Sequence, residues 1–311
     1  LFSFDFLREQ GVVKNCLVVA PLSTLTPVWE VETFESLYHL SVGVLHGTRA
    51  KRLTVLGEDH HIYVINHDGV STIQKELLAM KFDCVIIDEL AVYRNRRTDR
   101  WKSIRQLITN ATYAWGLTGA PTPNGPTDAY GQVKLLTPSN MNMSFRAWQQ
   151  LTMKQVSQFR WVPRADANDL VHVAMQPSVR FALEDCHDLP PITVSARDVK
   201  LSTRQAKAYK QLMSEYAMDS KKAGVITVVN EAARLNKLIQ VGAGFAYTRE
   251  GKGEYLDAKS RLKATLDLVT EAEGKVIVFA SYKWAVAMLE RVLSHIGTTL
   301  AITGATPTSQ R

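Results

Sequence analysis

Two adjacent carboxylates, Asp88 and Glu89, follow directly after the apolar run 84–87. A short run of this kind, with two β-branched isoleucines, predicts a strand that is buried on both faces of a parallel sheet. The two acids would then lie at the carboxyl edge of the sheet, where open α/β folds bind their ligands. Neighbouring charges are costly to bury, so a bound cation or a proton transfer would explain them. Two solvated acids at the end of a strand would give the same pattern, and the rest of the sequence must decide.

Polar residues follow three other apolar runs in the same way. The run 16–20 is followed by Pro21, Ser23 and Thr24, the run 62–66 ends in Asn66, and the run 113–117 leads into Thr118 and Gly119. Hydroxyl groups at a strand-to-helix junction suit a phosphate oxygen. Capping by Thr26, with Pro27 at the first helical position, explains the first group equally well.

The spacing of these runs predicts the elements that position the polar residues. Helical and extended patterns alternate through the first 120 residues, with a further strand expected at 42–46. Such alternation predicts an α/β fold with a doubly wound parallel sheet. Right-handed crossovers would bring the carboxyl ends of all its strands to one crevice.

The second half of the chain predicts fewer strands. A capping box at Ser202 and Gln205 predicts a helix to about residue 218, and further helices are expected at 225–241, 260–272 and 284–295. Residues 245–257 read as a loop, and residues 171–191 as irregular. Two strands, 276–280 and 299–303, would begin a second parallel α/β unit.

Composition indicates a globular protein, not a membrane protein. The chain has 311 residues, 46% of them hydrophobic and 22% charged, which allows two domains. No apolar run approaches the roughly 20 residues that span a bilayer. The three cysteines have no paired spacing, which indicates a reducing compartment.

The net charge of +7 is concentrated in the middle of the chain. Residues 91–165 contain 11 basic and two acidic side chains, and the basic cluster begins just after Glu89. This cluster favours a polyanionic partner, most simply a nucleic acid, although a solvated basic helix face is the simpler alternative. Aromatic and basic residues also interleave between 145 and 164, where they could stack on bases or pack into a core.

Several segments together resemble a known family. Residues 17–21 (LVVAP), 86–89 (IIDE) and 117–121 (LTGAP) fall in the order and spacing of motifs Ia, II and III of superfamily 2 helicases. The chain more closely resembles the Swi/Snf-type ATPases, particularly the short versions carried by phages. Residues 275–281 (KVIVFAS) resemble motif IV, and residues 302–306 resemble the strand and turn that follow it.

The resemblance implies a RecA-like fold with an insertion. Residues 1–137 would form the first RecA-like domain, residues 138–257 a helical insertion and linker, and residues 258–311 the start of a second RecA-like domain. The implied activity is that of an ATP-dependent DNA helicase or translocase, which couples ATP hydrolysis to movement on nucleic acid. A cytoplasmic location, in a bacterium or a phage-infected host cell, would follow.

The resemblance also implies roles for the residues at the strand ends. Asp88 would hold Mg²⁺ and Glu89 would activate water for attack on ATP, as in the Walker B motif of nucleotide hydrolases. Thr118 and Gly119 would couple hydrolysis to domain closure. The nucleic acid, most simply double-stranded DNA, would contact Pro21, Ser23, Thr24 and Asn66.

The chain departs from the family pattern in several places. It contains no P-loop of the form Gly-x-x-x-x-Gly-Lys-Thr, motif II reads Asp-Glu-Leu-Ala, and Ala120 stands where motif III usually has Thr. We therefore expect the chain to begin just after the P-loop and to end before motifs V and VI. Residues 1–311 alone should hydrolyse ATP weakly or not at all. The alternatives are a degenerate nucleic-acid-binding module and the motor part of a restriction-type nuclease.

Overall fold

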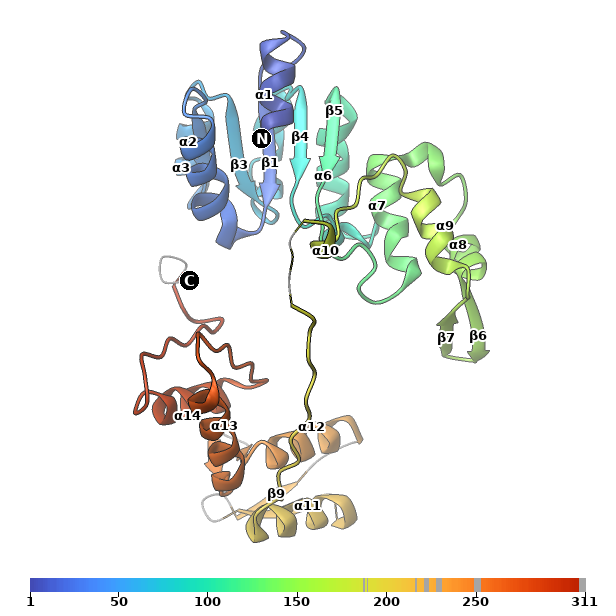
Figure 1. Cartoon of the computed structure of the whole chain (residues 1–311). Helices are drawn as coiled ribbons and strands as arrows, with labels where there is room; N and C mark the ends of the chain where they lie inside the picture. The colour runs from blue at the N-terminus through green and yellow to red at the C-terminus, as the bar shows by residue number, and fades with distance from the viewer. Residues whose placement is uncertain are drawn as a thin grey trace. The chain divides into compact units, whose positions relative to one another are not determined.

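The computed structural model describes residues 1–186, 188, 190–215, 217–220, 224–227, 231–248 and 253–307. The chain divides into two compact units, Leu1–His187 (unit 1) and Asp188–Arg311 (unit 2), which are coloured in sequence order in Figure 1. The segment expected as an insertion, residues 138–257, contributes to both units.

A five-stranded parallel sheet forms the centre of unit 1. Its strands are β1 (Cys16–Ala20), β2 (Val42–Leu45), β3 (Ile62–Asn66), β4 (Cys84–Ile87) and β5 (Tyr113–Gly116). They pair in the order β2-β3-β1-β4-β5, so β1 lies between β3 and β4, and β4 lies between β1 and β5. The predicted α/β fold with a doubly wound parallel sheet is confirmed.

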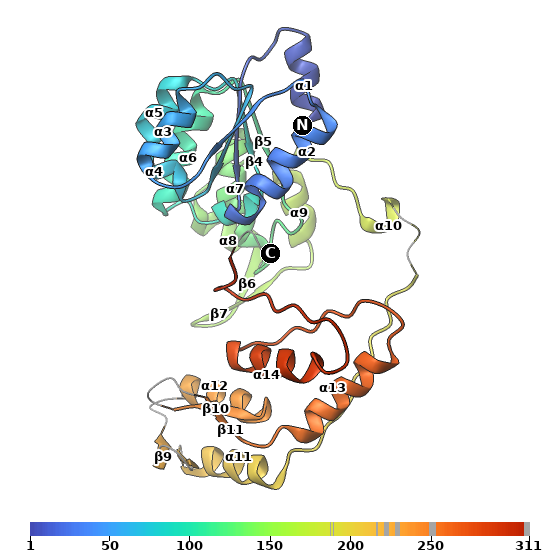
Figure 2. The same ribbon diagram turned by 90° about the vertical axis from the view of Figure 1, so that its left-hand side faces the viewer.

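Helices cover both faces of this sheet (Figure 2). One face packs against α3 (Arg49–Leu56), α4 (Gly69–Thr72), α5 (Gln74–Met80) and α6 (Asp99–Asn110), and the other against α1 (Phe2–Glu9) and the helical segment from Leu22 to Ser36, which ends in α2 (Val31–Ser36). Leu17 and Val19 of β1 are buried on the first face, and Cys16 and Val18 on the second. Burial on both faces explains why these strands read as continuous apolar runs.

A smaller subdomain follows β5. It contains α7 (Ala129–Leu136), α8 (Phe145–Thr152), the antiparallel hairpin β6 (Met153–Ser157) and β7 (Arg160–Pro163), α9 (Ala167–Ala174) and the short α10 (Leu183–Cys186). Trp148 is buried in its core, and the indole N–H donates to the carbonyl oxygen of Pro126 at 3.1 Å. The helical insertion expected from residue 138 therefore contains a β-hairpin, and α9 occupies part of the stretch expected to be irregular.

Unit 2 begins with the predicted capping box. The Ser202 hydroxyl accepts the Gln205 main-chain N–H at 3.2 Å, and the Gln205 side chain accepts the Ser202 N–H at 3.0 Å. This box starts α11 (Thr203–Glu215). The other described elements are β8 (Ala217–Ser220), β9 (Gly224–Thr227), α12 (Glu231–Gly242), β10 (Phe245–Tyr247), β11 (Gly253–Tyr255), α13 (Lys259–Glu271) and α14 (Lys283–Leu293).

Two hairpins in unit 2 correct the sequence predictions. β8 pairs with β9, so the helix expected from residue 225 begins only at Glu231, and the helix expected to reach residue 218 ends at Glu215. β10 pairs with β11 within the stretch that was expected to be a loop. In both places the strands are stabilised by pairing with a neighbour that the local pattern does not reveal.

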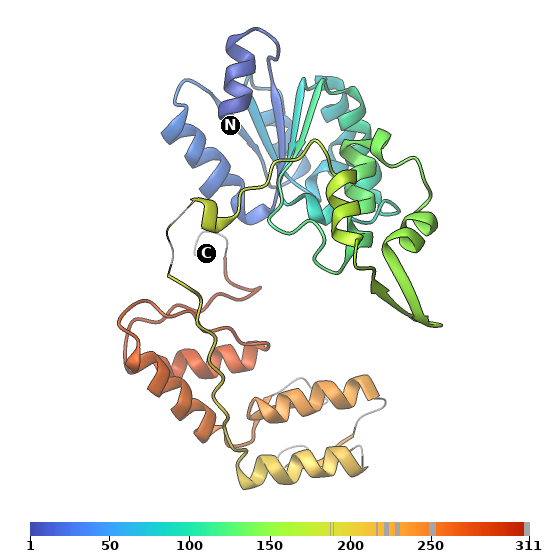
Figure 3. The ribbon, with the colours of Figure 1, turned by 45° about the vertical axis from the view of Figure 1, so that its right-hand side comes forward.

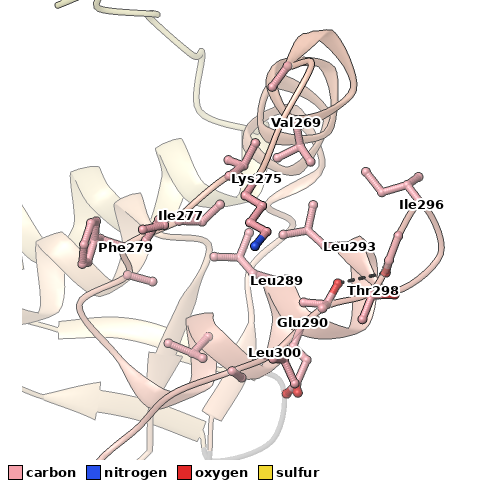
Figure 4. A pocket seen from close by; sticks show the side chains of 18 of the residues that line it. Val269, Lys275, Ile277, Phe279, Leu289, Glu290, Leu293, Ile296, Thr298 and Leu300 are labelled. Atoms are coloured by element: carbon pink, nitrogen blue, oxygen red, sulfur yellow. Dashed lines mark hydrogen bonds between the residues drawn. The ribbon is translucent and has the colours of Figure 1, made fainter. Parts of the chain in front are cut away.

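The strands predicted at 276–280 and 299–303 are wrong as elements of this structure. Both segments lack regular secondary structure, and neither joins a ladder with any described part of the chain. A strand needs a partner for its main-chain hydrogen bonds, and the side chains of Ile277 and Phe279 remain 79% and 92% exposed. Together with α13 and α14 these segments line a pocket of about 1310 Å³, whose wall includes Val269, Leu289 and Leu293 (Figure 4).

Candidate nucleotide and nucleic-acid site

The side chain of Asp88 is fixed at the carboxyl end of β4. Its main-chain N–H donates to the Val19 carbonyl oxygen at 2.8 Å, which extends the pairing of β4 with β1. Its Oδ1 accepts the Glu89 N–H at 3.0 Å, and its Oδ2 accepts the Trp29 indole N–H at 3.2 Å. A carboxylate has about four lone pairs, so this half-buried group keeps acceptor capacity for a cation.

Glu89 has a left-handed backbone, with φ 54° and ψ 56°. This conformation costs an L-residue about 1–2 kcal/mol, and residues held in it cluster at functional sites. The chain then enters a 3₁₀ turn, Leu90–Tyr93, in which the Leu90 N–H donates to the Leu117 carbonyl oxygen at 2.8 Å. Leu90 is buried by this turn, whereas the Glu89 side chain is exposed at the sheet edge.

Thr118 meets Glu89 from the neighbouring strand. The Leu117 N–H donates to the Ile87 carbonyl oxygen at 2.8 Å, which extends the pairing of β5 with β4. The Thr118 hydroxyl donates to Glu89 Oε1 at 3.1 Å. The structure therefore brings together three of the predicted residues, Asp88, Glu89 and Thr118. Gly119 follows Thr118 and is exposed. A Cβ at this position would have no atom within 4 Å, so no close contact requires a glycine there.

Pro21, Ser23 and Thr24 lie where β1 ends and the helical segment begins. Ser23 is exposed, and the Thr24 hydroxyl donates to the Pro21 carbonyl oxygen at 3.0 Å. The prediction that Thr26 caps this segment is wrong, because helical backbone already begins at Leu22. Its position is set by the buried side chains of Leu25 and Trp29, so the local capping signal does not decide where it starts.

Asn66, at the end of β3, is tied to a buried arginine. Its Oδ1 accepts from Arg52 Nη2 at 3.0 Å, and Arg52 also donates to the carbonyl oxygens of Gly47 at 3.0 Å and Leu45 at 2.6 Å. Burial lowers the pKa of Arg52. A Cβ at Gly69 would lie 2.2 Å from Arg52 Nη1, so a larger residue there would displace the Arg52 guanidinium. This network fixes the edge formed by β2 and β3.

The sequence did not reveal a buried histidine–tyrosine pair at the same edge. His67 follows Asn66 directly, and its Nδ1 lies 3.0 Å from the Tyr93 hydroxyl. Burial lowers the pKa of His67 to about 4, with a smaller contribution from Arg100, and burial raises the pKa of Tyr93. His67 Nε2 has no hydrogen-bond partner among the described residues. The position of His67 next to Asn66 was the one available signal.

Most of the basic cluster between residues 94 and 105 has partners within unit 1. Three of its cations form ion pairs: Arg100 with Asp68, Lys102 with Asp99 at 2.9 Å, and Arg94 with Asp128 at 4.0 Å. Arg105 donates to the Leu135 carbonyl oxygen at 3.0 Å. The Arg96 guanidinium lies 5.7 Å from the centroid of the Tyr130 ring. These contacts connect α6 and the turn before it to Asp68 and to the segment 128–136, which contains α7. The cluster still carries a positive charge, but its side chains are largely engaged.

Two negative findings limit other kinds of site. None of the helices in the described part of the chain has the length and apolar composition needed to cross a bilayer. Among the described residues, no three side chains of His, Cys, Asp or Glu are grouped so that they could hold a metal ion between them.

The fold and the edge residues together define an α/β protein of the RecA-like class. Residues 5–242 match the family model of the SNF2-related domain, and the chain belongs to this family, as its motifs predicted. It is similar to protein p41 of Acyrthosiphon pisum secondary endosymbiont phage 1, with 24% identity over 90% of this chain and 64% of p41. It is also similar in fold to the Sulfolobus solfataricus SWI2/SNF2 ATPase core in complex with dsDNA.

The structural similarity to the Sulfolobus protein has a TM-score of 0.51 at 19% sequence identity and covers 94% of this chain and 62% of the other. The chain thus spans a little under two thirds of the length of each of these two proteins. At this level of identity, the comparison with the Sulfolobus structure establishes the shared RecA-like fold.

Proposed function

We propose that this chain is part of an ATP-dependent motor of the Swi/Snf class, which couples ATP hydrolysis to movement on DNA. The observation that carries the proposal is the arrangement at the end of β4. Asp88 and Glu89 lie side by side, and Glu89 is held in a left-handed conformation with its carboxylate bonded to Thr118. A strained acid oriented by a neighbouring hydroxyl fits a catalytic role better than a merely solvated one.

The residues at this edge fit a magnesium nucleotide. Mg²⁺ keeps several waters and is typically bound by one or two carboxylates together with substrate phosphates, so it needs no cage of protein ligands. Asp88, which retains free acceptor capacity, would hold it. When bound, Mg²⁺ would neutralise the charge of the ATP phosphates. Glu89 would position the attacking water and accept its proton, and Thr118 would orient the Glu89 carboxylate.

We assign the residues for coupling and for DNA contact by their positions at the sheet edge. Thr118 and Gly119 lie next to Glu89, so they are placed to relay the state of the nucleotide. Pro21, Ser23, Thr24 and Asn66 end neighbouring strands of the same sheet and would contact the DNA backbone. The dsDNA in the Sulfolobus structure supports a duplex as the partner, and the phage relative supports action in a bacterial or phage-infected cell.

The test is a measurement of DNA-stimulated ATP hydrolysis by the full gene product. We expect Glu89→Gln to lower the rate at least about 100-fold, as for removal of a general base, while DNA binding is retained. The matched control is Glu35→Gln, which removes another exposed acid of unit 1 and should leave hydrolysis unchanged.

Two results would count against the proposal. If Glu89→Gln retained hydrolysis within a few-fold of the unaltered protein, Glu89 would not be the catalytic carboxylate. If the unaltered protein bound DNA without hydrolysing ATP, the degenerate nucleic-acid-binding module would be the better description.

A further inference from the structure

The β6–β7 hairpin extends from unit 1 with an exposed aromatic ring at its tip. Residues Gln158 and Phe159 connect the two strands, and the Phe159 side chain is 88% exposed. In all three views the hairpin projects beyond α8 and α9, in the direction to which the carboxyl ends of the sheet strands point (Figures 1, 2 and 3). It therefore extends on the same side as Asp88 and Ser23.

The pairing of the hairpin places two cations on one face. Lys154 is paired with Val162, and Arg160 lies two residues before Val162, so all three side chains share a face. Gln155 pairs with Trp161 on the other face. Among the described residues, neither Lys154 nor Arg160 forms an ion pair, in contrast to the engaged cations near α6.

The segment of chain that contains the hairpin carries charge of one sign. Residues 129–165, between Asp128 and Asp166, contain five basic side chains and no acidic one. This segment of 37 residues has no carboxylate of its own that would repel a phosphate, and the two unpaired cations could each neutralise one.

Packing within unit 1 accounts for Trp148 and Phe145 of this region but not for Phe159. Trp148 is fully enclosed, and Phe145 packs edge-to-face on the Tyr130 ring with centroids 5.4 Å apart. Phe159 has no such ring partner among the described residues. An exposed ring at the tip of a cationic hairpin is suited to stacking on an unpaired base, since every base has a π-face.

We infer that the β6–β7 hairpin binds a single-stranded segment of nucleic acid, with Phe159 stacked on a base and Lys154 and Arg160 on the adjacent phosphates. The inference rests on the proposed function for the identity of the partner as DNA. It adds a contact outside the strand ends of the sheet, and it predicts that unpaired DNA binds to a different part of unit 1 from the duplex.

The test measures binding of the full chain to a labelled single-stranded oligonucleotide of about 16 nucleotides, by fluorescence anisotropy over a range of salt concentrations. We expect Phe159→Ala to weaken binding about fivefold or more, as for loss of one stacked base, without changing the salt dependence. Phe159→Trp should retain binding, whereas Phe159→Leu should not restore it, because stacking requires an aromatic ring.

The double variant Lys154→Ala/Arg160→Ala should change the salt dependence instead. The slope of log K against log salt is negative, and loss of two phosphate contacts on a single strand reduces its magnitude by about 1.4. Two controls match these changes. Phe6→Ala removes an exposed ring from α1, and Lys14→Ala/Lys75→Ala removes two exposed lysines, and neither should alter binding.

The outcomes separate this inference from the proposed function. If the unaltered chain bound DNA but the hairpin variants matched their controls, the hairpin assignment would be wrong and the motor proposal would stand. Equal weakening of single-stranded and duplex binding by Phe159→Ala would refute stacking on an unpaired base. If neither this chain nor the full gene product bound DNA, both proposals would fail.

Discussion

The buried histidine beside the candidate site makes the stability of unit 1 depend on pH. His67 is 8% exposed, and burial lowers its pKa to about 4. Arg100 lowers this pKa further, whereas Asp68 and Asp88 oppose the shift. In the unfolded chain the same imidazole has a pKa of about 6.5.

The sign of the effect follows from the two pKa values. Between pH 6.5 and pH 4 the unfolded state binds a proton that folded His67 does not, so acid favours unfolding. The stabilisation is complete above the unfolded pKa and is lost as the pH falls toward 4. With one pKa unit worth about 1.4 kcal/mol, the loss between pH 7 and pH 5 is about 2 kcal/mol.

The measurement is urea unfolding of the full chain at several pH values, followed by tryptophan fluorescence. Five of the six tryptophans lie in unit 1, so the signal reports mainly on the unit that contains His67. We compare the unaltered chain with His67→Gln, which keeps a polar group near the Tyr93 hydroxyl but does not titrate.

The informative quantity is the difference between the two pH profiles, because other groups also titrate. Burial lowers the pKa of His61 as well, and its contribution has the same sign but is common to both proteins. We expect the unaltered chain to lose about 2 kcal/mol more than His67→Gln between pH 7 and pH 5. Parallel profiles would refute the conclusion that His67 is held neutral by burial.

Two further predictions concern packing and thiol accessibility. A Cβ at Gly131 would lie 2.2 Å from the main-chain carbonyl oxygen of Arg94, so Gly131→Ala should lower the free energy of unfolding, measured in urea, by about 1–3 kcal/mol. The control is Gly119→Ala, whose new Cβ would have no atom within 4 Å. It should lower the free energy of unfolding by less than about 0.5 kcal/mol. Cys16 and Cys84 are buried, burial raises the pKa of Cys16, and Cys186 is exposed. The native chain should therefore react rapidly with a thiol reagent at one cysteine, Cys186, and rapid reaction of all three would contradict the burial of β1 and β4.

The sheet of unit 1 could be predicted because its strands carry a strong local signal. The runs at 16–20 and 62–66 match β1 and β3 residue for residue, since both faces of each strand are buried and few polar residues interrupt them. The helical signals were weaker. The helical segment after β1 begins at Leu22, four residues before the expected cap at Thr26.

The second half of the chain shows where a local pattern is insufficient. β9 consists of residues that also fit an amphipathic helix, and it becomes a strand only by pairing with β8. Residues 276–280 have strong strand propensity, yet they pair with no described segment and form no strand. Propensity permits a strand, but a ladder requires a second strand at the right distance, and that information lies elsewhere in the sequence.

The candidate site follows the same rule, because its geometry depends on the order of the strands. Asp88 and Glu89 could be found from the end of one apolar run, but the partners that fix them come from two others. Trp29 follows β1 and binds Asp88, whereas Thr118 follows β5 and binds Glu89. Because β4 lies between β1 and β5, Asp88 receives a side-chain donor from the segment after β1, and Glu89 receives one from the segment after β5. Trp29 lies 59 residues before Asp88 in the chain, and only the order of the strands brings its indole to the Asp88 carboxylate. The sequence around Trp29 therefore gave no signal of this role.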